Sequence, residues 1–221
     1  MKKSKLQLAI LAVSALACAT TVQANLVTGT IWSLAPLDNF DAIAANLPSA
    51  GTPGVTFSVN SPLDFTSFDG PNNTGNPGAY YTIGSWLATG GAFNINYGAG
   101  YSPNSTIDQT IMLITGQVTV ANGQQFTVTH DDGLTLTIGS QTVINVPGPT
   151  PPITTTETYS GPSGTFDFSL IYAEVDGAPA VLQLDLPLTA VPEPTTVLAG
   201  VLLLLPFGAS TLRILRRNRT A

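Results

Sequence analysis

The middle of this 221-residue chain contains neither lysine nor arginine. All seven basic residues lie near the two ends, whereas residues 25–190 carry twelve carboxylates, namely Asp38, Asp41, Asp64, Asp69, Asp108, Asp131, Asp132, Glu157, Asp167, Glu174, Asp176 and Asp185. Binding to nucleic acid or to an anionic membrane surface needs clustered Lys or Arg and is therefore excluded. Each carboxylate must be solvated, hydrogen-bonded or neutralised by a metal cation, although composition bias alone also accounts for the pattern.

Cysteine and histidine are almost as scarce, with one residue of each. Cys18 falls in a segment that we expect to be removed, so no disulfide is predicted. His130 alternates with Phe126 and Val128, which predicts an inward-facing core histidine. Serine–histidine hydrolase chemistry would need this residue, yet no Gly-x-Ser-x-Gly elbow accompanies it. No carboxylate pair is singled out as acid and base either, and we predict that the protein is not an enzyme.

The N-terminus has the pattern of a secretory signal peptide over residues 1–24. Lys2, Lys3 and Lys5 precede an apolar stretch over residues 6–17, and Ala24 ends a small-x-small cleavage site. We therefore predict a short signal helix and export. A lipoprotein cleavage site before Cys18 is a lesser alternative.

The C-terminal residues 191–221 predict a transmembrane helix over residues 196–212, because no charge interrupts that stretch and about 18 apolar residues suffice to span a bilayer core. Prolines mark its outer boundary, and arginines, which favour the cytoplasmic side, mark its inner one. The flanking residues are Pro192, Glu193 and Pro194 on one side and Arg213, Arg216, Arg217 and Arg219 on the other. An ordinary membrane anchor accounts for this pattern.

The order Pro-Glu-Pro, apolar span and arginine cluster also resembles the PEP-CTERM sorting signal. The resemblance implies recognition by an exosortase at the inner membrane of a Gram-negative-type bacterium. It further implies delivery of residues 25–190 to the cell surface or to an exopolysaccharide matrix. The signal is an address and carries no information about what the exported domain does.

Residues 25–190 predict one all-β domain, an antiparallel β-sandwich, because apolar and polar residues alternate and helical periodicity is nearly absent. The segments expected to be strands are 27–32, 55–59, 63–68, 110–120 with an interruption at Gly116, 125–130, 134–138, 142–146, 166–172 and 180–186. Asn122-Gly123 is a strong hairpin signal, residues 147–152 must form a loop because they are rich in proline, and residues 69–78 read as a surface loop. One helical turn is expected at 41–46, and residues 86–99 remain undecided.

The stretch Asp131-Asp132-Gly133 is the candidate functional site. Two adjacent carboxylates between hairpin-like strands can converge on a hard cation, which prefers oxygen ligands, and Gly133 allows the chain to turn. Alternatively, these residues only cap a turn by accepting backbone hydrogen bonds.

The stretch resembles the Asp-Asp-Gly core of the protective-antigen-type β-sandwich, and residues 171–180 resemble its later loop and last strand. In lectin members of that family, aspartates joined by a cis peptide bind calcium and then sugar hydroxyls. The resemblance implies these roles for Asp131 and Asp132 beside Gly133, with Glu174 or Asp176 as further calcium ligands.

We therefore expect an exported, non-enzymatic, calcium-assisted carbohydrate- or matrix-binding protein. A purely structural matrix component without a specific ligand is the main alternative, and an accessory domain of a glycoside hydrolase is a lesser one.

Overall fold

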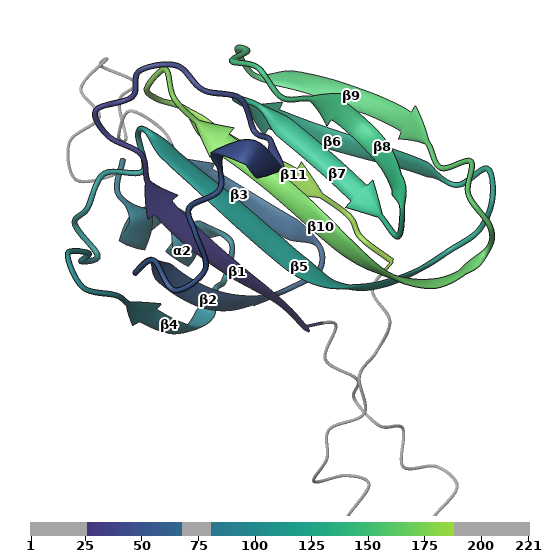
Figure 1. Cartoon of the computed structure of the whole chain (residues 1–221), viewed down its shortest axis with the longest axis horizontal. Coiled ribbons are helices and arrows are strands. Elements are labelled where there is room, and N and C mark those ends of the chain that lie inside the picture. Colours follow the sequence, from purple (N-terminus) through teal and green to yellow (C-terminus); the bar gives the residue numbers. More distant parts are fainter. Residues whose placement is uncertain (1–25, 68–80, 188–221) are drawn as a thin grey trace, which may run out of the picture. The chain divides into compact units, whose positions relative to one another are not determined.

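Two antiparallel β-sheets pack face to face in the computed structural model, which describes residues 26–67 and 81–187 (Figure 1). The larger sheet, sheet A, has the strand order β4 (Phe93–Tyr97), β2 (Val55–Asn60), β1 (Leu26–Ser33), β5 (Thr110–Val120), β10 (Gly164–Glu174), β7 (Leu134–Ile138) and β8 (Gln141–Val146). The smaller, sheet B, has the order β3 (Leu63–Ser67), β11 (Ala180–Leu184), β6 (Gln125–Asp131) and β9 (Ile153–Thr158). The predicted all-β sandwich is thus confirmed.

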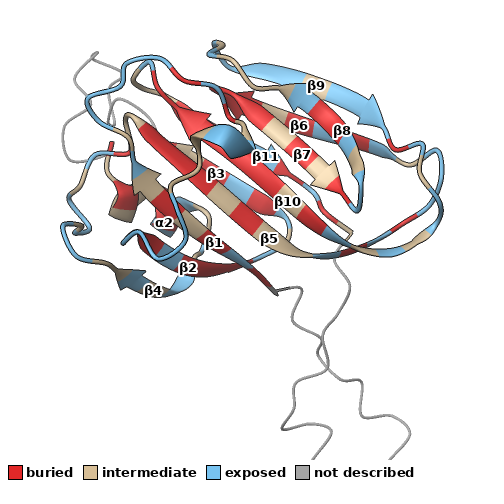
Figure 2. Ribbon diagram, in the orientation of Figure 1, coloured by how far each residue is buried: buried red, intermediate tan, exposed pale blue. Residues whose placement is uncertain are grey.

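The core lies between the sheets and is formed by the apolar residues of each alternating strand. Figure 2 shows long buried stretches on β5 and β10, whereas the edge strand β9 is mostly exposed. Trp86 stacks on Phe65 at 4.1 Å and lies nearly parallel to Tyr172 at 6.0 Å. All three rings are fully buried. Since the described residues contain no Lys or Arg, this apolar core and neutral hydrogen bonds supply the stability.

The undecided stretch 86–99 resolves into the end of a helix followed by a strand. Helix α2 covers Ile83–Thr89 and is started by a capping box, in which Thr82 and Ser85 bond reciprocally to each other's backbone. Its seven residues give too few turns for a helical period to be seen in the sequence. Strand β4 follows at the edge of sheet A.

Two further expectations, one about strand β5 and one about the connection Ala121–Gln124 that follows it, are wrong. Gly123 turns with φ +82°, but β5 and β6 belong to different sheets, so Asn122-Gly123 leads from one sheet to the other and forms no hairpin. Strand β5 also runs unbroken through Gly116. A side chain at Gly116 would meet Phe168 and Val27 at 2.9 Å, so this glycine makes room for core side chains.

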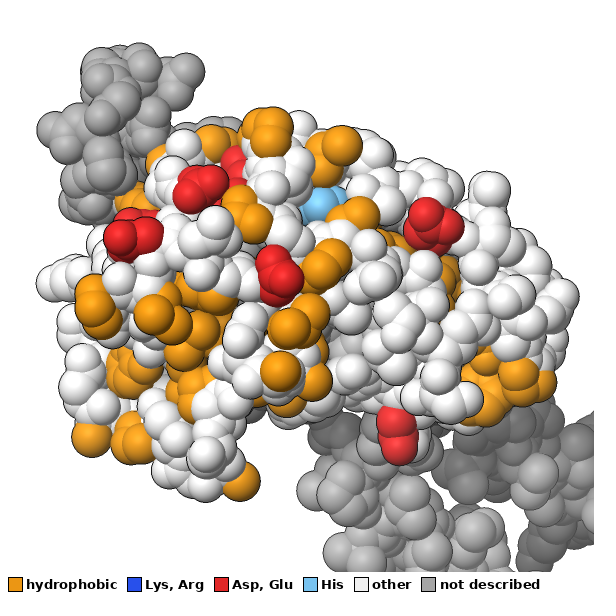
Figure 3. Space-filling view, turned by 45° about the horizontal axis from the view of Figure 1, so that its top comes forward, with side chains coloured by type: hydrophobic (Ala, Val, Ile, Leu, Met, Phe, Trp, Pro, Cys, Tyr) orange, Lys and Arg blue, Asp and Glu red, His pale blue; other side chains and the backbone are white. Residues whose placement is uncertain are grey.

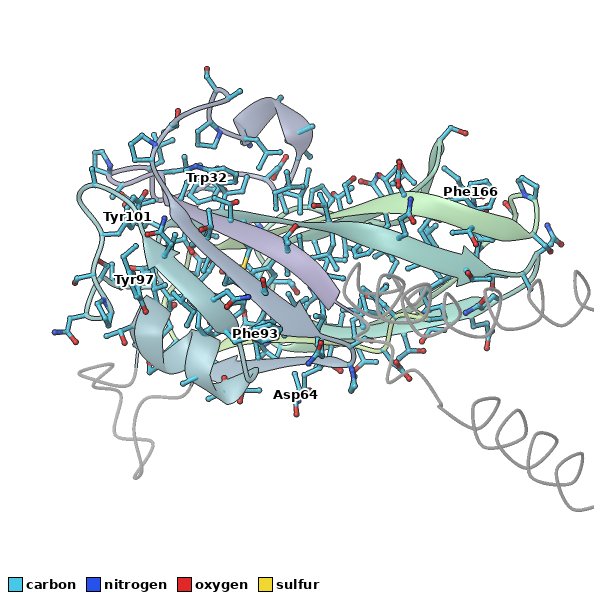
Figure 4. The ribbon with its side chains drawn as sticks, turned by 90° about the horizontal axis from the view of Figure 1, so that it is seen from below. Trp32, Asp64, Phe93, Tyr97, Tyr101 and Phe166 are labelled. Atoms are coloured by element: carbon cyan, nitrogen blue, oxygen red, sulfur yellow. The ribbon has the colours of Figure 1, made fainter. Side chains whose placement is uncertain are left out.

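A second apolar cluster covers the outer face of sheet A. Residues 34–54, which include the one-turn helix η1 (Ala44–Asn46) near the expected position, place Phe40 and Ala42 against Ile111 and Ile171. Figure 4 shows Trp32 beneath this segment, and its indole nitrogen donates to the Thr52 carbonyl at 3.2 Å. The same segment also contacts the loop that follows β8, because the Ala42 amide donates to the Pro147 carbonyl.

Both tails lie outside the described residues, and so do the predicted signal peptide, the sorting signal and the loop 69–78. Asn25–Thr189 form one compact unit. Within residues 26–67 and 81–187, no helix has the length and apolar character needed to span a membrane.

Candidate functional site

The Asp131-Asp132-Gly133 stretch connects the two sheets. Asp131 ends β6 in sheet B and Leu134 begins β7 in sheet A, so the expected hairpin-like pairing on either side of the carboxylates is absent. The peptide between Asp131 and Asp132 is cis, as the family resemblance implied. Gly133 is required here by close approach, because a Cβ atom would lie 1.9 Å from the Pro147 carbonyl oxygen.

The Asp132 carboxylate accepts three backbone amides from two segments of the chain. Its Oδ1 accepts from the Thr150 amide at 3.1 Å, and its Oδ2 accepts from the amides of Val175 at 2.8 Å and Asp176 at 3.1 Å. The turn-capping role is therefore present. The Asp131 side chain also hydrogen-bonds with that of Asp132, so the about four acceptor positions of the Asp132 carboxylate are largely used within the protein.

Asp131 and Asp132 line a pocket of about 350 Å³ together with Asp176. The rest of the lining comes from two loops, as Pro149, Thr150, Pro151 and Pro152 on one side and Gly177, Ala178 and Pro179 on the other. The Asp131 side chain is only 5% exposed. Its burial, followed by the charges of Asp132 and Asp176, raises the pKa of Asp131 to about 7. The pocket thus concentrates negative charge without a basic side chain.

The predicted ligand Glu174 lies elsewhere. It is fully buried, and Tyr81 donates to its Oε1. The Tyr172 hydroxyl contacts the Asp131 carbonyl oxygen and also Glu174 Oε2, the latter at 2.8 Å. The hydroxyls of Tyr81 and Tyr172 thus both donate to this carboxyl group. Burial nevertheless raises the pKa of Glu174 well above its ordinary value.

Glu174 is therefore a buried support of the Asp131–Gly133 turn. Through Tyr172 it fixes the Asp131 carbonyl, and it is not among the residues that line the pocket. Asp176, the other predicted ligand, does line it.

His130 supports the Asp132 carbonyl, as Tyr172 supports the Asp131 carbonyl. The ring is fully buried, as the alternation predicted, and its Nδ1 lies 2.5 Å from the Asp132 carbonyl oxygen. Burial lowers the pKa of His130, which keeps the ring neutral. Because the carbonyl only accepts, Nδ1 carries the hydrogen and Nε2 accepts from Thr155 at 3.1 Å. The histidine is thus a structural support of the turn.

Asp108 was missed by the sequence analysis. Its Oδ1 is buried without a hydrogen-bond partner in the protein. Burial raises its pKa; backbone amides, including that of Gly177, lower it, and the nearby charges of Asp132 and Asp176 raise it again. Asp108 precedes β5 by two residues, and no pattern around it sets it apart from the other carboxylates. Only the folded chain brings it toward the pocket.

These carboxylates do not form a complete metal centre by themselves. Across residues 26–67 and 81–187, no three His, Cys, Asp or Glu side chains are arranged to hold an ion. The predicted sorting-signal residues lie outside this part of the chain.

The chain matches no known family profile and no curated protein. Two solved structures are similar in fold. One is a PA14 sugar-binding domain from an RTX adhesin, with 22% identity, a TM-score of 0.49, and coverage of 75% of this chain and 90% of that one. The other is the PA14 domain of the antifreeze protein MpAFP, with 18% identity, a TM-score of 0.48, and coverage of 76% and 85%.

Proposed function

We propose that this protein is an exported, non-enzymatic binding protein that uses calcium at Asp131 and Asp132 to hold a carbohydrate of the cell surface or matrix. The observation that carries the proposal is the pocket itself. Asp131, Asp132 and Asp176 line it, and no Lys or Arg in the described residues can neutralise them. The hydrogen-bond partner of the Asp131 carboxyl group is the neighbouring carboxylate of Asp132, and a cation could take the place of the hydrogen between them.

The donor set suits calcium, which takes six to eight oxygen ligands from carboxylates, carbonyls and waters. The carboxyl groups of Asp131, Asp132 and Asp176 line the pocket, and waters and carbonyls would have to complete the shell. A bound calcium ion would offset the repulsion between these groups and leave coordination positions for the hydroxyl groups of a sugar. Asp131 and Asp132 would hold it with Asp176 as a further ligand, while the amide bonds of Asp132 keep the loops in place.

The test is the melting temperature of the full chain in millimolar calcium and in chelator. Calcium at a hundredfold excess over Kd should stabilise the fold by about 2.7 kcal/mol, which raises the melting temperature by about 5–10 °C for a domain of this size. Magnesium should act more weakly because it demands a stricter octahedral shell.

Asp131→Asn should remove the calcium response. Asp64→Asn is the matched control, because Asp64 points into solvent on sheet B (Figure 4) and only accepts from Gln183. Identical melting curves of the wild-type protein in calcium and chelator would leave turn capping as the sole role of the pair. A glycan array probed with and without calcium then separates a carbohydrate binder from a purely structural matrix component.

Export and sorting belong to the same proposal and rest on the two tails. We expect cleavage after Ala24 and recognition of Pro192-Glu193-Pro194 by an exosortase before release to the surface. Intact-mass measurement on surface-extracted protein should show a species that lacks residues 197–221. A mass that includes the arginine cluster would support a retained membrane anchor.

A further inference from the structure

A second hollow lies on the other side of the proline-rich loop. It has a volume of about 260 Å³ and is lined by Val146, Pro147, Ile153 and Thr155, with His130 at its base. Figure 3 shows hydrophobic side chains and several carboxylates close together on this face of the molecule. Ile153 is 47% exposed, which makes it one of three large hydrophobic side chains classed as exposed in the described residues.

The two hollows share one wall. Thr150 lines both of them, and its amide donates to Asp132 Oδ1 at 3.1 Å. His130 directly precedes Asp131 in β6 and bonds to the Asp132 carbonyl. A ligand held at the carboxylates therefore needs to reach only across residues 148–150 to place a substituent in the second hollow.

The hydrogen bonds that the lining side chains already make indicate which kind of substituent fits this hollow. The Nδ1 hydrogen of His130 is used by the Asp132 carbonyl, the Thr155 hydroxyl donates to Nε2, and the Thr150 hydroxyl donates to the Pro151 carbonyl at 3.2 Å. The remaining lining side chains are apolar. No side chain of this lining thus has a hydrogen to offer, and a group that needs donors, such as a carboxylate, a sulfate or an acetyl carbonyl, would lose its water without replacement.

We infer that this hollow receives a methyl group of the sugar residue bound at Asp131 and Asp132, so that the protein selects deoxy or methyl-ether sugars over their parent hexoses. The inference rests on the proposed calcium and carbohydrate site. Burial of one methyl group against Val146 and Ile153 corresponds to about a threefold to fivefold gain in affinity.

Calorimetric titration of the full chain in calcium tests this preference. The probes are mannose, galactose and glucose, each compared with its 6-deoxy and its 3-O-methyl derivative. The two derivatives separate a ring methyl group from a methyl ether. At least one of them should bind threefold to fivefold more tightly than its parent sugar.

Two substitutions should abolish the preference while the calcium-induced rise in melting temperature persists. Val146→Thr keeps the shape of the side chain, and Ile153→Thr keeps a strand-forming residue; each makes the hollow polar. Leu37→Thr is the control, because Leu37 is 53% exposed and outside both hollows.

Equal affinity of the wild-type protein for the parent and the methyl-bearing sugars would overturn this inference and leave the proposed function intact. A preference that survives both Val146→Thr and Ile153→Thr would also overturn it. If none of the sugars binds in calcium, both proposals are wrong.

Discussion

Strand β6 is entered and left by connections that cross from one sheet to the other, and the two crossings are built from different groups. At Ala121–Gln124 the bonds are neutral: Asn122 Nδ2 donates to the carbonyls of Ser160 and Gly161 at 2.9 Å each. At Asp131–Gly133 the acceptor is the Asp132 carboxylate, with Asp131 and Asp176 beside it.

The difference bears on the proposed cation site at the second crossing. The neutral crossing satisfies Asn122 and Gly123 with partners from the protein, and the Gly123 amide donates to the Tyr159 carbonyl at 2.8 Å. Such bonds would suffice to turn the chain at the other end as well. The concentration of buried carboxylates there costs stability through desolvation and repulsion, and a cation that relieves this cost is the simplest reason to keep it.

The largest expected effect separates the two turn glycines. Gly133→Ala should destabilise the fold by about 3 kcal/mol or more, because the Pro147 carbonyl 1.9 Å away must move. Gly123→Ala meets no atom within 4 Å and suffers only from its φ of +82°, at a cost of about 1–2 kcal/mol. Urea unfolding of both variants checks the order. Equal losses would mean that the loop at residue 147 yields easily, contrary to its proposed role as a wall.

The next comparison concerns the two capping side chains. Asp132→Ala removes the acceptor of three amides, among them that of buried Val175, and should cost about 2–3 kcal/mol. Asn122→Ala removes two exposed neutral bonds and should cost about 1 kcal/mol. The measurement is again the free energy of unfolding in chelator. A smaller loss for Asp132→Ala than for Asn122→Ala would show that relief of repulsion outweighs the lost bonds.

A further difference is a pH dependence at the carboxylate crossing. The folded pKa of Asp131 is about 7, above the model value of 3.8, so the native state binds the proton more tightly than the unfolded state does. Stability should therefore fall as pH rises from about 4 to about 7. Asp131→Asn should make this fall less steep in chelator, whereas Asn122→Ala should keep it; the raised pKa values of Glu174 and Asp108 account for the remaining slope. A wild-type stability that rises steadily over the same range would contradict the assignment.

Most of the strands could be predicted from local sequence patterns. Alternation with period two located β5, β6, β7, β8, β10 and β11 because each strand buries one face, a property that neighbouring residues reveal. The proline-rich loop followed from the missing amides of its prolines. Helix α2 could not be predicted from the sequence. Its capping box indicates a helix only together with the packing of the helix against the core.

The candidate site, too, could be predicted from the sequence only in part. The amino-acid sequence shows that the domain contains no basic side chain and that two adjacent aspartates precede Gly133, and these facts direct attention to a cation. The folded structure was needed to show that β6 and β7 belong to different sheets and that Asp132 accepts from an amide 44 residues away. It was also needed to show that Glu174 is buried outside the pocket lining and that Asp108 is near Asp132. Side-chain alternation depends only on the nearest neighbours along a strand and is therefore visible in the sequence. The distance between carboxylates depends on how separate strands pack and is therefore visible only in the folded protein.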